Sequence, residues 1–140
     1  MEFLDTNVII RYLTGDNAEQ AQRAYHLFQQ VEAGKRLITT CEAVLAEVVY
    51  VLSSKVLYNL DRNEIRTHLR TIITLRGLRL SHKTTYLQAL DLYVEHPYLS
   101  FVDALCAAQA QRTHSSHILS FDRDFDRVPG LMRREPSSGT

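Results

Sequence analysis

Short apolar segments alternate with longer amphipathic ones along the chain, and this alternation restricts the fold more than any other feature. The short segments predict strands at 3–4, 36–39, 78–80, 117–120 and, at an edge, 131–132. The longer segments predict helices at 6–13, 18–33, 41–54, 62–75, 83–95, 100–113 and 122–127. Strands that alternate with helices favour a parallel sheet covered on both faces. We therefore expect an α/β fold, a three-layer α/β/α sandwich whose central, mainly parallel sheet has about four to five strands.

Several predicted helices carry recognisable start signals. Asp16 and Asp61 precede the second and fourth helices, where an aspartate is a favoured N-cap. Thr39 and Glu42 stand three residues apart before the third helix, which is the spacing of a capping box.

Length and composition predict one globular domain. The chain has 140 residues, 45% of them hydrophobic, so we expect a single domain over 1–134 and a polar, disordered tail over 135–140. Its 16 basic and 16 acidic side chains give no net charge, so any nucleic-acid role must depend on a local site.

Cysteine usage and hydropathy indicate a soluble cytoplasmic protein. Cys41 and Cys106 lie in apolar helical segments without CxxC spacing, so buried, reduced thiols are expected. The N-terminus lacks the features of a signal peptide. We also expect no membrane segment, because no apolar run approaches the roughly 18 to 20 residues that span a bilayer.

Three apolar segments each contain one lone carboxylate. These are Asp5 within 3–10, Glu47 within 43–52 and Asp103 within 99–110. Burial of an unpaired carboxylate costs several kcal/mol, so the repeated pattern calls for a compensating partner. Structural alternatives remain: Asp5 as the N-cap of the first helix, and Asp103 as the acid of a capping box.

Glu47 has no capping role, because Glu42 already occupies the first turn of that helix. Glu47 shares a stripe with Val44 and Val51, so we expect it to face with the apolar residues. A salt bridge to a buried arginine is the structural alternative.

A fourth acid, Asp122, follows the fourth predicted strand, and Asp124 and Asp126 come at alternate positions after it. A calcium-binding EF-hand is excluded, because Arg127 and Arg133 stand where the loop needs Gly and Glu. Asp122 as a helix N-cap is the alternative, and Asp124 is an equally possible fourth acid.

Acids that follow strands one and four, or lie on the packed helices, can converge at the carboxyl edge of a parallel sheet. A divalent cation would relieve their repulsion, and oxygen ligands select Mg²⁺ or Mn²⁺ over zinc. Such a site suits phosphoryl chemistry, because the metal orients a water and stabilises the leaving oxygen.

The sequence resembles PIN-domain ribonucleases, most closely the VapC-type toxins of toxin–antitoxin pairs. The fragments that carry the resemblance are FLDTNVIIRYLTGD, AVLAEVVYVL, FVDALCAAQA and SFDRDF, which together extend from about Met1 to Leu131. Each fragment alone is weak evidence for the family, but the four fragments in this order and spacing are specific to it.

The resemblance implies a metal-dependent endoribonuclease with the acidic quartet Asp5, Glu47, Asp103 and Asp122. Asp5, Asp103 and Asp122 would hold Mg²⁺ or Mn²⁺, and Glu47 would bind a metal-held water or act as general base. Thr6, Asn7 and Ser120, with Asp124, would line the site. The implied partners are an RNA substrate, a protein antitoxin and a second copy of the chain in a homodimer.

Arg11 and Arg123 lie near the predicted site and are candidates for RNA phosphate contact. The arginines at 62, 66 and 70 share a helix face, although a solvated, ion-paired face explains them as well. Alternative functions are a non-catalytic PIN-fold binding module and a haloacid-dehalogenase-like phosphatase. The phosphatase needs a second aspartate where Asn7 stands.

Overall fold

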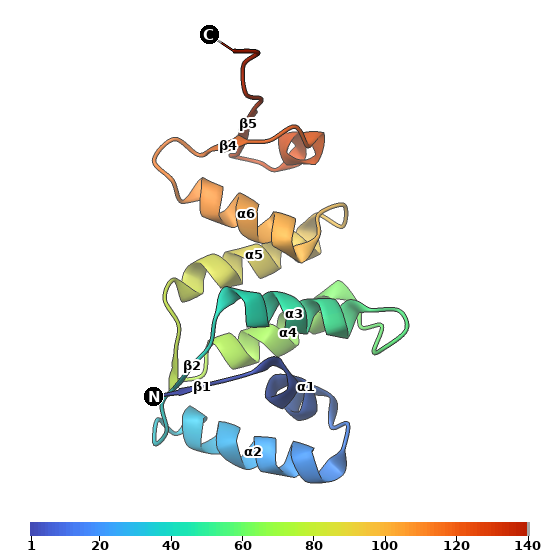
Figure 1. Ribbon diagram of the computed structural model, residues 1–140, viewed down its shortest axis with the longest axis vertical. Coiled ribbons are helices and arrows are strands. Elements are labelled where there is room, and N and C mark those ends of the chain that lie inside the picture. Colours follow the sequence, from blue (N-terminus) through green and yellow to red (C-terminus); the bar gives the residue numbers. More distant parts are fainter. Residues whose placement is uncertain (140) are drawn as a thin grey trace. The chain divides into compact units, whose positions relative to one another are not determined.

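The computed structural model describes residues 1–139 and divides into two compact units, Met1–Lys83 and Thr84–Thr140, each considered by itself here (Figure 1). The first unit contains β1 (Glu2–Phe3), α1 (Thr6–Thr14), α2 (Ala18–Glu32), β2 (Ile38–Thr39), α3 (Glu42–Ser53), α4 (Arg62–Ile73) and β3 (Leu78–Arg79). α5 (Lys83–Glu95) begins at the boundary. The second unit continues with α6 (Phe101–Gln111), β4 (His117–Leu119), the 3₁₀ helix η1 (Arg123–Arg127) and β5 (Met132–Arg134).

The first unit is built on a three-stranded sheet in the order β1-β2-β3, and both pairings are parallel. Ile38 at the start of β2 pairs with Glu2 on one side and Leu78 on the other. Parallel neighbours require helical crossovers, which α1 to α4 supply. The carboxyl ends of the three strands therefore lie at one edge of the sheet, where α1 and α3 begin.

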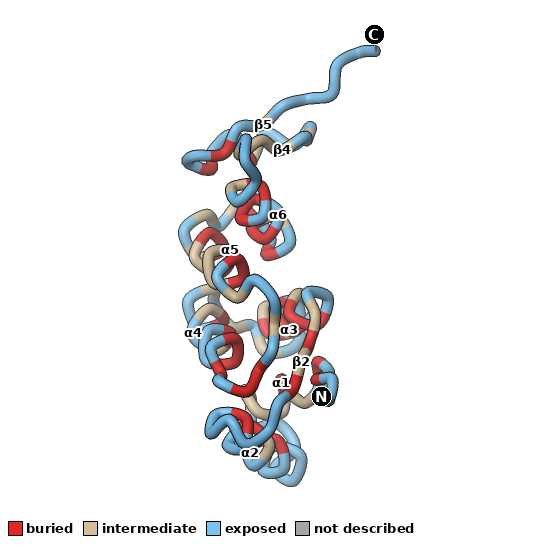
Figure 2. The backbone as a smooth tube through the Cα atoms, turned by 90° about the vertical axis from the view of Figure 1, so that its left-hand side faces the viewer, coloured by how far each residue is buried: buried red, intermediate tan, exposed pale blue. Residues whose placement is uncertain are grey.

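Apolar helix faces form the core of the first unit. α1 packs against α2 and α3, and α3 packs against α4. The fully buried side chains include Ile9 of α1, Phe28 of α2, Leu45 of α3 and Leu69 of α4. Figure 2 shows these buried positions recurring between exposed ones along the helices, as amphipathic periodicity requires.

The second unit combines a two-stranded parallel sheet with apolar helices. β4 pairs with β5 from His117 opposite Met132 to Leu119 opposite Arg134. Ala104, Ala107 and Ala108 of α6 are completely buried. Their small side chains allow close approach of neighbouring elements.

The predicted α/β class is confirmed, and all five strands pair in parallel, three in the first unit and two in the second. The single domain over 1–134 stays a prediction. Glu135, at the start of the predicted tail, accepts a hydrogen bond from Arg133. Thr140, at its end, lies outside the described residues.

Of the helix N-caps predicted from the sequence at Asp16, Thr39 and Asp61, one is confirmed and two are wrong. Asp61 caps α4 by accepting a hydrogen bond from the Glu64 amide at 2.8 Å. The cap of α2 is Asn17, not Asp16. Thr39 is no capping residue, because it lies in β2 and its hydroxyl donates to the Arg79 carbonyl at 2.7 Å.

The prediction of two buried thiols is also wrong. Cys41 is half-buried and Cys106 is exposed. Cys106 lies on the side of α6 opposite its buried alanines, because a helix places only one stripe inside. Within residues 1–139, no helix combines the length and apolar character that crossing a membrane needs.

Candidate functional site

Asp5 follows the last residue of β1 by two positions, and hydrogen bonds of the intervening Leu4 hold the backbone there. The amide of Leu4 donates to the Thr39 carbonyl at 2.7 Å, and the Leu4 carbonyl accepts from the buried Thr40 hydroxyl at 2.9 Å. Asp5 has extended dihedrals (φ −94°, ψ 163°) and occupies the N-cap position of α1. The N-cap position expected for Asp5 is therefore confirmed, but its side chain makes no cap hydrogen bond.

The next two residues complete a polar start to α1. Thr6 is buried, and its Oγ1 has no hydrogen-bond partner among the described residues. An unsatisfied buried hydroxyl is costly and calls for an explanation. Asn7 is exposed and faces a cavity. Two consecutive residues after β1 therefore have side chains without a hydrogen bond among the described residues. These are the carboxylate of Asp5, which makes no cap bond, and the buried hydroxyl of Thr6.

Glu47 lies on α3 but does not face the core as expected. It is exposed, whereas Val44, three residues earlier, is 8% exposed. The buried stripe of α3 consists of Val44, Leu45, Val48, Val49 and Leu52. Glu47 lies outside this stripe, on the polar side that an amphipathic helix turns toward solvent. The carboxylate is thus accessible, and the idea that it needs a buried partner is wrong.

Asp103 is half-buried in the first turn of α6. Its backbone amide donates to the hydroxyl of Ser100, the N-cap residue, at 3.1 Å. This bond is one half of the predicted capping box and fixes the backbone of Asp103. The Asp103 carboxylate extends from a rigid turn.

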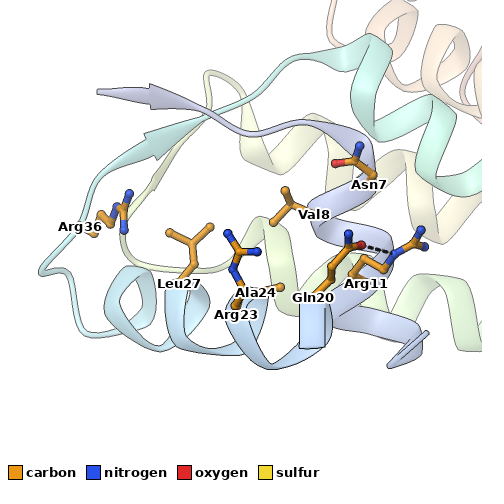
Figure 3. A pocket seen from close by; sticks show the side chains of 8 residues that line it. All are labelled: Asn7, Val8, Arg11, Gln20, Arg23, Ala24, Leu27 and Arg36. Carbon is orange, nitrogen blue, oxygen red and sulfur yellow. Dashed lines mark hydrogen bonds between the residues drawn. The ribbon is translucent and has the colours of Figure 1, made fainter. Parts of the chain in front are cut away.

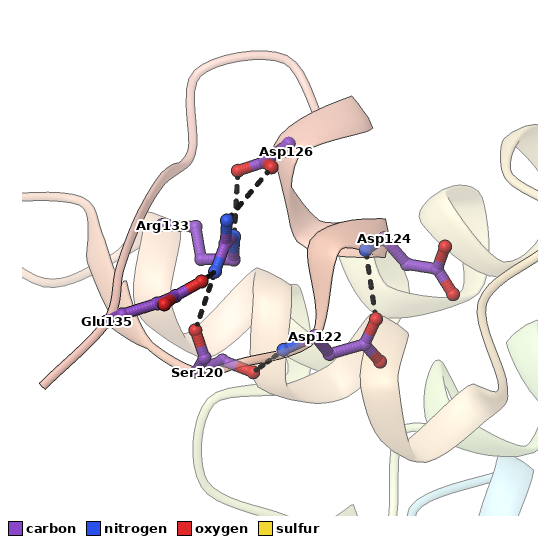
Figure 4. A network of polar contacts seen from close by, with 6 residues as sticks. All are labelled: Ser120, Asp122, Asp124, Asp126, Arg133 and Glu135. Atoms are coloured by element: carbon purple, nitrogen blue, oxygen red, sulfur yellow. Dashed lines mark hydrogen bonds and ion pairs between the residues drawn. The ribbon is translucent and has the colours of Figure 1, made fainter.

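Asp122 lies in a tightly hydrogen-bonded loop between β4 and η1 (Figure 4). Its amide donates to the Ser120 hydroxyl at 3.0 Å, and its Oδ1 accepts from the Asp124 amide at 2.9 Å. The N-cap alternative is therefore confirmed for Asp122, which is exposed, while Asp124 is half-buried. One Asp122 oxygen serves the cap, and the other stays available.

Arg133 of β5 ties this loop together (Figure 4). Its guanidinium donates to both carboxylate oxygens of Asp126, to Glu135 at 2.6 Å and to the Ser120 carbonyl at 3.0 Å. The hydrogen bonds that Arg133 donates to Asp126 and Glu135 raise the pKa of its guanidinium, which keeps its charge at every working pH. Sequence reasoning used Arg133 only to exclude an EF-hand and missed this role.

The candidate acids divide equally between the two units. Asp5 and Glu47 belong to the first, and Asp103 and Asp122 to the second. Taken unit by unit over residues 1–139, no three His, Cys, Asp or Glu side chains are grouped to hold a metal ion. The donors that the chain offers are carboxylate and hydroxyl oxygens, which suit Mg²⁺ or Mn²⁺.

A cavity of about 520 Å³ lies in the first unit beside α1 and α2 (Figure 3). Its lining is Asn7, Val8, Arg11, Gln20, Arg23, Ala24, Leu27 and Arg36. Of these, the sequence pattern predicts only Asn7 and Arg11 as site residues. A usable signal existed in the spacing of Gln20, Ala24 and Leu27, which places them on one face of α2.

Two comparisons with known proteins match nearly the whole chain. The family model described as "PIN domain" matches residues 3–131. The protein named VapC ribonuclease from Aquifex aeolicus (strain VF5) is 25% identical over 128 residues, which cover 91% of this chain and 92% of that relative.

Proposed function

We propose that this chain, which belongs to the PIN-domain family, is a Mg²⁺- or Mn²⁺-dependent endoribonuclease and the toxin of a toxin–antitoxin pair. The family match confirms the resemblance drawn from the four sequence fragments. The likeness to a VapC ribonuclease over nine-tenths of both chains is the observation that carries the proposal.

We assign the metal-holding role to Asp5, Asp103 and Asp122. Two features of the first unit support this assignment for Asp5. Its carboxylate makes no hydrogen bond to the helix that it precedes, and the buried hydroxyl of Thr6 next to it has no partner within residues 1–139. A buried polar atom without a partner, such as the Thr6 hydroxyl, calls for an explanation, and a bound ion nearby is one.

The remaining roles in the proposed reaction are assigned to the other residues that the sequence predicts for the site. A bound Mg²⁺ or Mn²⁺ would neutralise the charge of the phosphodiester and make an attacking water more acidic. Glu47, whose carboxylate is exposed, would accept the proton of that water. Asn7 and Ser120, with Asp124, would orient RNA and water, and Arg11 and Arg123 would contact phosphate. Cleavage would leave 5′-phosphate and 3′-hydroxyl ends.

The proposed biological setting includes two protein partners and the cytoplasm. A protein antitoxin would bind the chain and block access to Asp5, and two copies of the chain would form a homodimer. Size-exclusion chromatography with light scattering tests the homodimer, and co-purification with the product of a neighbouring small gene tests the antitoxin.

The central experiment compares RNA cleavage by the full chain and two matched variants. Wild type and Asp61→Asn should cleave a labelled single-stranded RNA in Mg²⁺ or Mn²⁺, and Asp5→Asn should not. Asp61 is the right control, because it is also an N-cap aspartate but has a purely structural bond to Glu64. Chelation by EDTA should abolish the activity of wild type. Full activity in Asp5→Asn contradicts the site assignment.

The second candidate function is a non-catalytic binding module on the same fold. Mg²⁺ or Mn²⁺ should raise the melting temperature of the wild type by mass action, but not that of Asp5→Asn. An unchanged melting temperature in wild type, together with no RNA cleavage, would favour the binding module.

A further inference from the structure

The cavity beside α1 and α2 has the size and lining of a ligand site that the acidic quartet does not use. Its volume of about 520 Å³ falls within the range of about 300–1,000 Å³ that is common for small-molecule sites. All its lining residues lie between Asn7 and Arg36, within the first unit.

Three arginines are spread along the cavity. Figure 3 shows Arg36 at one end, Arg11 at the other and Arg23 between them. Each has an acidic neighbour: Asp16 at 3.9 Å from Arg11, Glu19 at 4.0 Å from Arg23 and Glu2 at 2.6 Å from Arg36. The side chains of these pairs are between 31% and 84% exposed, and ion pairs at the surface contribute little free energy. A phosphate can therefore replace the acidic partners.

Arg23 is the least constrained of the three guanidinium groups. Its side chain is 77% exposed, and its ion pair with Glu19 is at the outer limit of contact. By contrast, the Nε of Arg11 donates to the Gln20 side chain at 2.9 Å. Arg23 thus has the freedom to bind a phosphate or to lie flat against a base.

The remaining lining residues suit a flat ring with a polar edge. Val8, Leu27 and the buried Ala24 give an apolar surface, and the Asn7 and Gln20 side chains add amide donors and acceptors. Single-stranded RNA is recognised by this combination of stacking, amide hydrogen bonds to base edges and cationic contact with phosphate. An acidic peptide would pair with the arginines, but its carboxylates would make no use of the apolar surface formed by Val8, Ala24 and Leu27.

The position of the cavity connects it to the proposed reaction. Asn7 lines it and follows Asp5 by two residues in the first turn of α1. We infer that this cavity binds one nucleotide of the RNA strand next to the cleaved bond, with its phosphate on Arg23 and its base against Leu27. The inference rests on the proposed ribonuclease function and adds a subsite to it.

Binding measured without cleavage tests the inference. The full chain, in EDTA, is titrated into a short fluorescein-labelled single-stranded RNA of mixed sequence at several salt concentrations. Arg23→Ala should bind about tenfold more weakly, and its log–log salt slope should be shallower by about 0.7, the value for one lost contact to single-stranded nucleic acid. Leu27→Ala should also weaken binding, but with the salt slope unchanged.

Arg66→Ala is the matched control. Arg66 is an arginine on the polar side of α4, and its Nη2 donates to the Asn63 side chain at 2.9 Å. Its affinity and salt slope should equal those of wild type. Melting temperatures of all variants, measured in parallel, identify any loss of binding that comes from unfolding.

Three results would overturn the inference. One is wild-type affinity in both Arg23→Ala and Leu27→Ala. Another is a loss of binding in Arg66→Ala but not in Arg23→Ala, which would assign RNA to α4. The last is a cavity variant that loses binding of an acidic peptide and keeps RNA, which would assign the cavity to a protein partner. If the expected binding pattern holds but wild type fails to cleave RNA in Mg²⁺, RNA binding by the cavity stands, whereas the proposed ribonuclease function fails.

Discussion

The guanidinium of Arg133 holds the carboxylate of Asp126 at two points, Nε to Oδ1 at 2.9 Å and Nη2 to Oδ2 at 3.3 Å. The pair joins β5 to η1, and the third nitrogen of Arg133 reaches the Ser120 carbonyl at the end of β4. One side chain thereby links all the segments that surround Asp122.

We predict that Arg133→Lys lowers both the melting temperature and the rate of RNA cleavage, the latter by about tenfold or more. Lysine keeps the charge but cannot make the planar two-point contact. The measurements are a thermal melt and initial cleavage rates in Mg²⁺. Arg134→Lys, at the exposed neighbouring position, is the control and should match wild type. Equal behaviour of the two variants would show that Arg133 does not fix the loop.

Asp5 and Asp122 should differ in their effects on stability. Asp122→Ala should lower the free energy of unfolding by ~1 kcal/mol, because the Asp122 carboxylate caps η1. Asp5→Ala should cost less than about 0.5 kcal/mol, since its side chain makes no cap bond and loses only its interaction with the α1 dipole. Urea unfolding in EDTA measures both values. The reverse order would contradict the hydrogen bonding described for these two acids.

Gly77 should not tolerate a side chain. A Cβ there would lie 2.3 Å from the Arg36 carbonyl oxygen and 2.6 Å from that of Val31. Both atoms belong to the backbone, so neither can move without disturbing the end of α2 or the segment that leads into β2. Gly77→Ala should therefore lower the free energy of unfolding by ~3 kcal/mol. Gly130→Ala, where space is open and only the positive φ opposes a side chain, should cost about 1 kcal/mol.

Lys83 should make the free energy of unfolding depend on pH in the alkaline range. Burial, and then the charge of Arg79, lower the pKa of the Lys83 ammonium below its ordinary value of 10.5. Between the lowered pKa and 10.5, the unfolded chain keeps a proton that the folded chain releases. Stability from this group therefore rises with pH across that window and is constant on either side of it.

Urea unfolding of wild type and Lys83→Met through this pH window measures the effect. The stability of wild type relative to the variant should increase with pH, because the contributions of other groups, including the tyrosines, are common to both proteins. A relative stability that is flat or falls with pH would contradict the lowered pKa.

Local signals in the sequence predicted part of this structure correctly. Asp61 and Ser100 cap helices whose first turns contain their partners, so the sequence distance is three residues in each case. Thr39 matched a local pattern equally well, yet its hydroxyl bonds to Arg79, forty residues away in β3. Thr39 pairs in the sheet and does not cap a helix, and no local sequence pattern distinguishes a residue of the first kind from one of the second.

The candidate site shows the same limit. The lone acids were found because each interrupts an apolar segment, but the segment does not reveal exposure. Glu47 lies outside the buried stripe of α3, and periodicity by itself cannot decide how far such a stripe extends. Its exposure depends on the elements packed against α3.

The amino-acid sequence by itself determined the order of strands and helices, the α/β class and the family, and it supplied the four candidate acids, since these depend on residue type and spacing. The tertiary structure alone decided the contacts of Arg133, the crowding at Gly77 and the cavity of Arg11, Arg23 and Arg36. Each of these joins segments that are remote in sequence or belong to different elements. The physical reason is that periodicity orients a side chain relative to its own element, whereas only packing places one element against another.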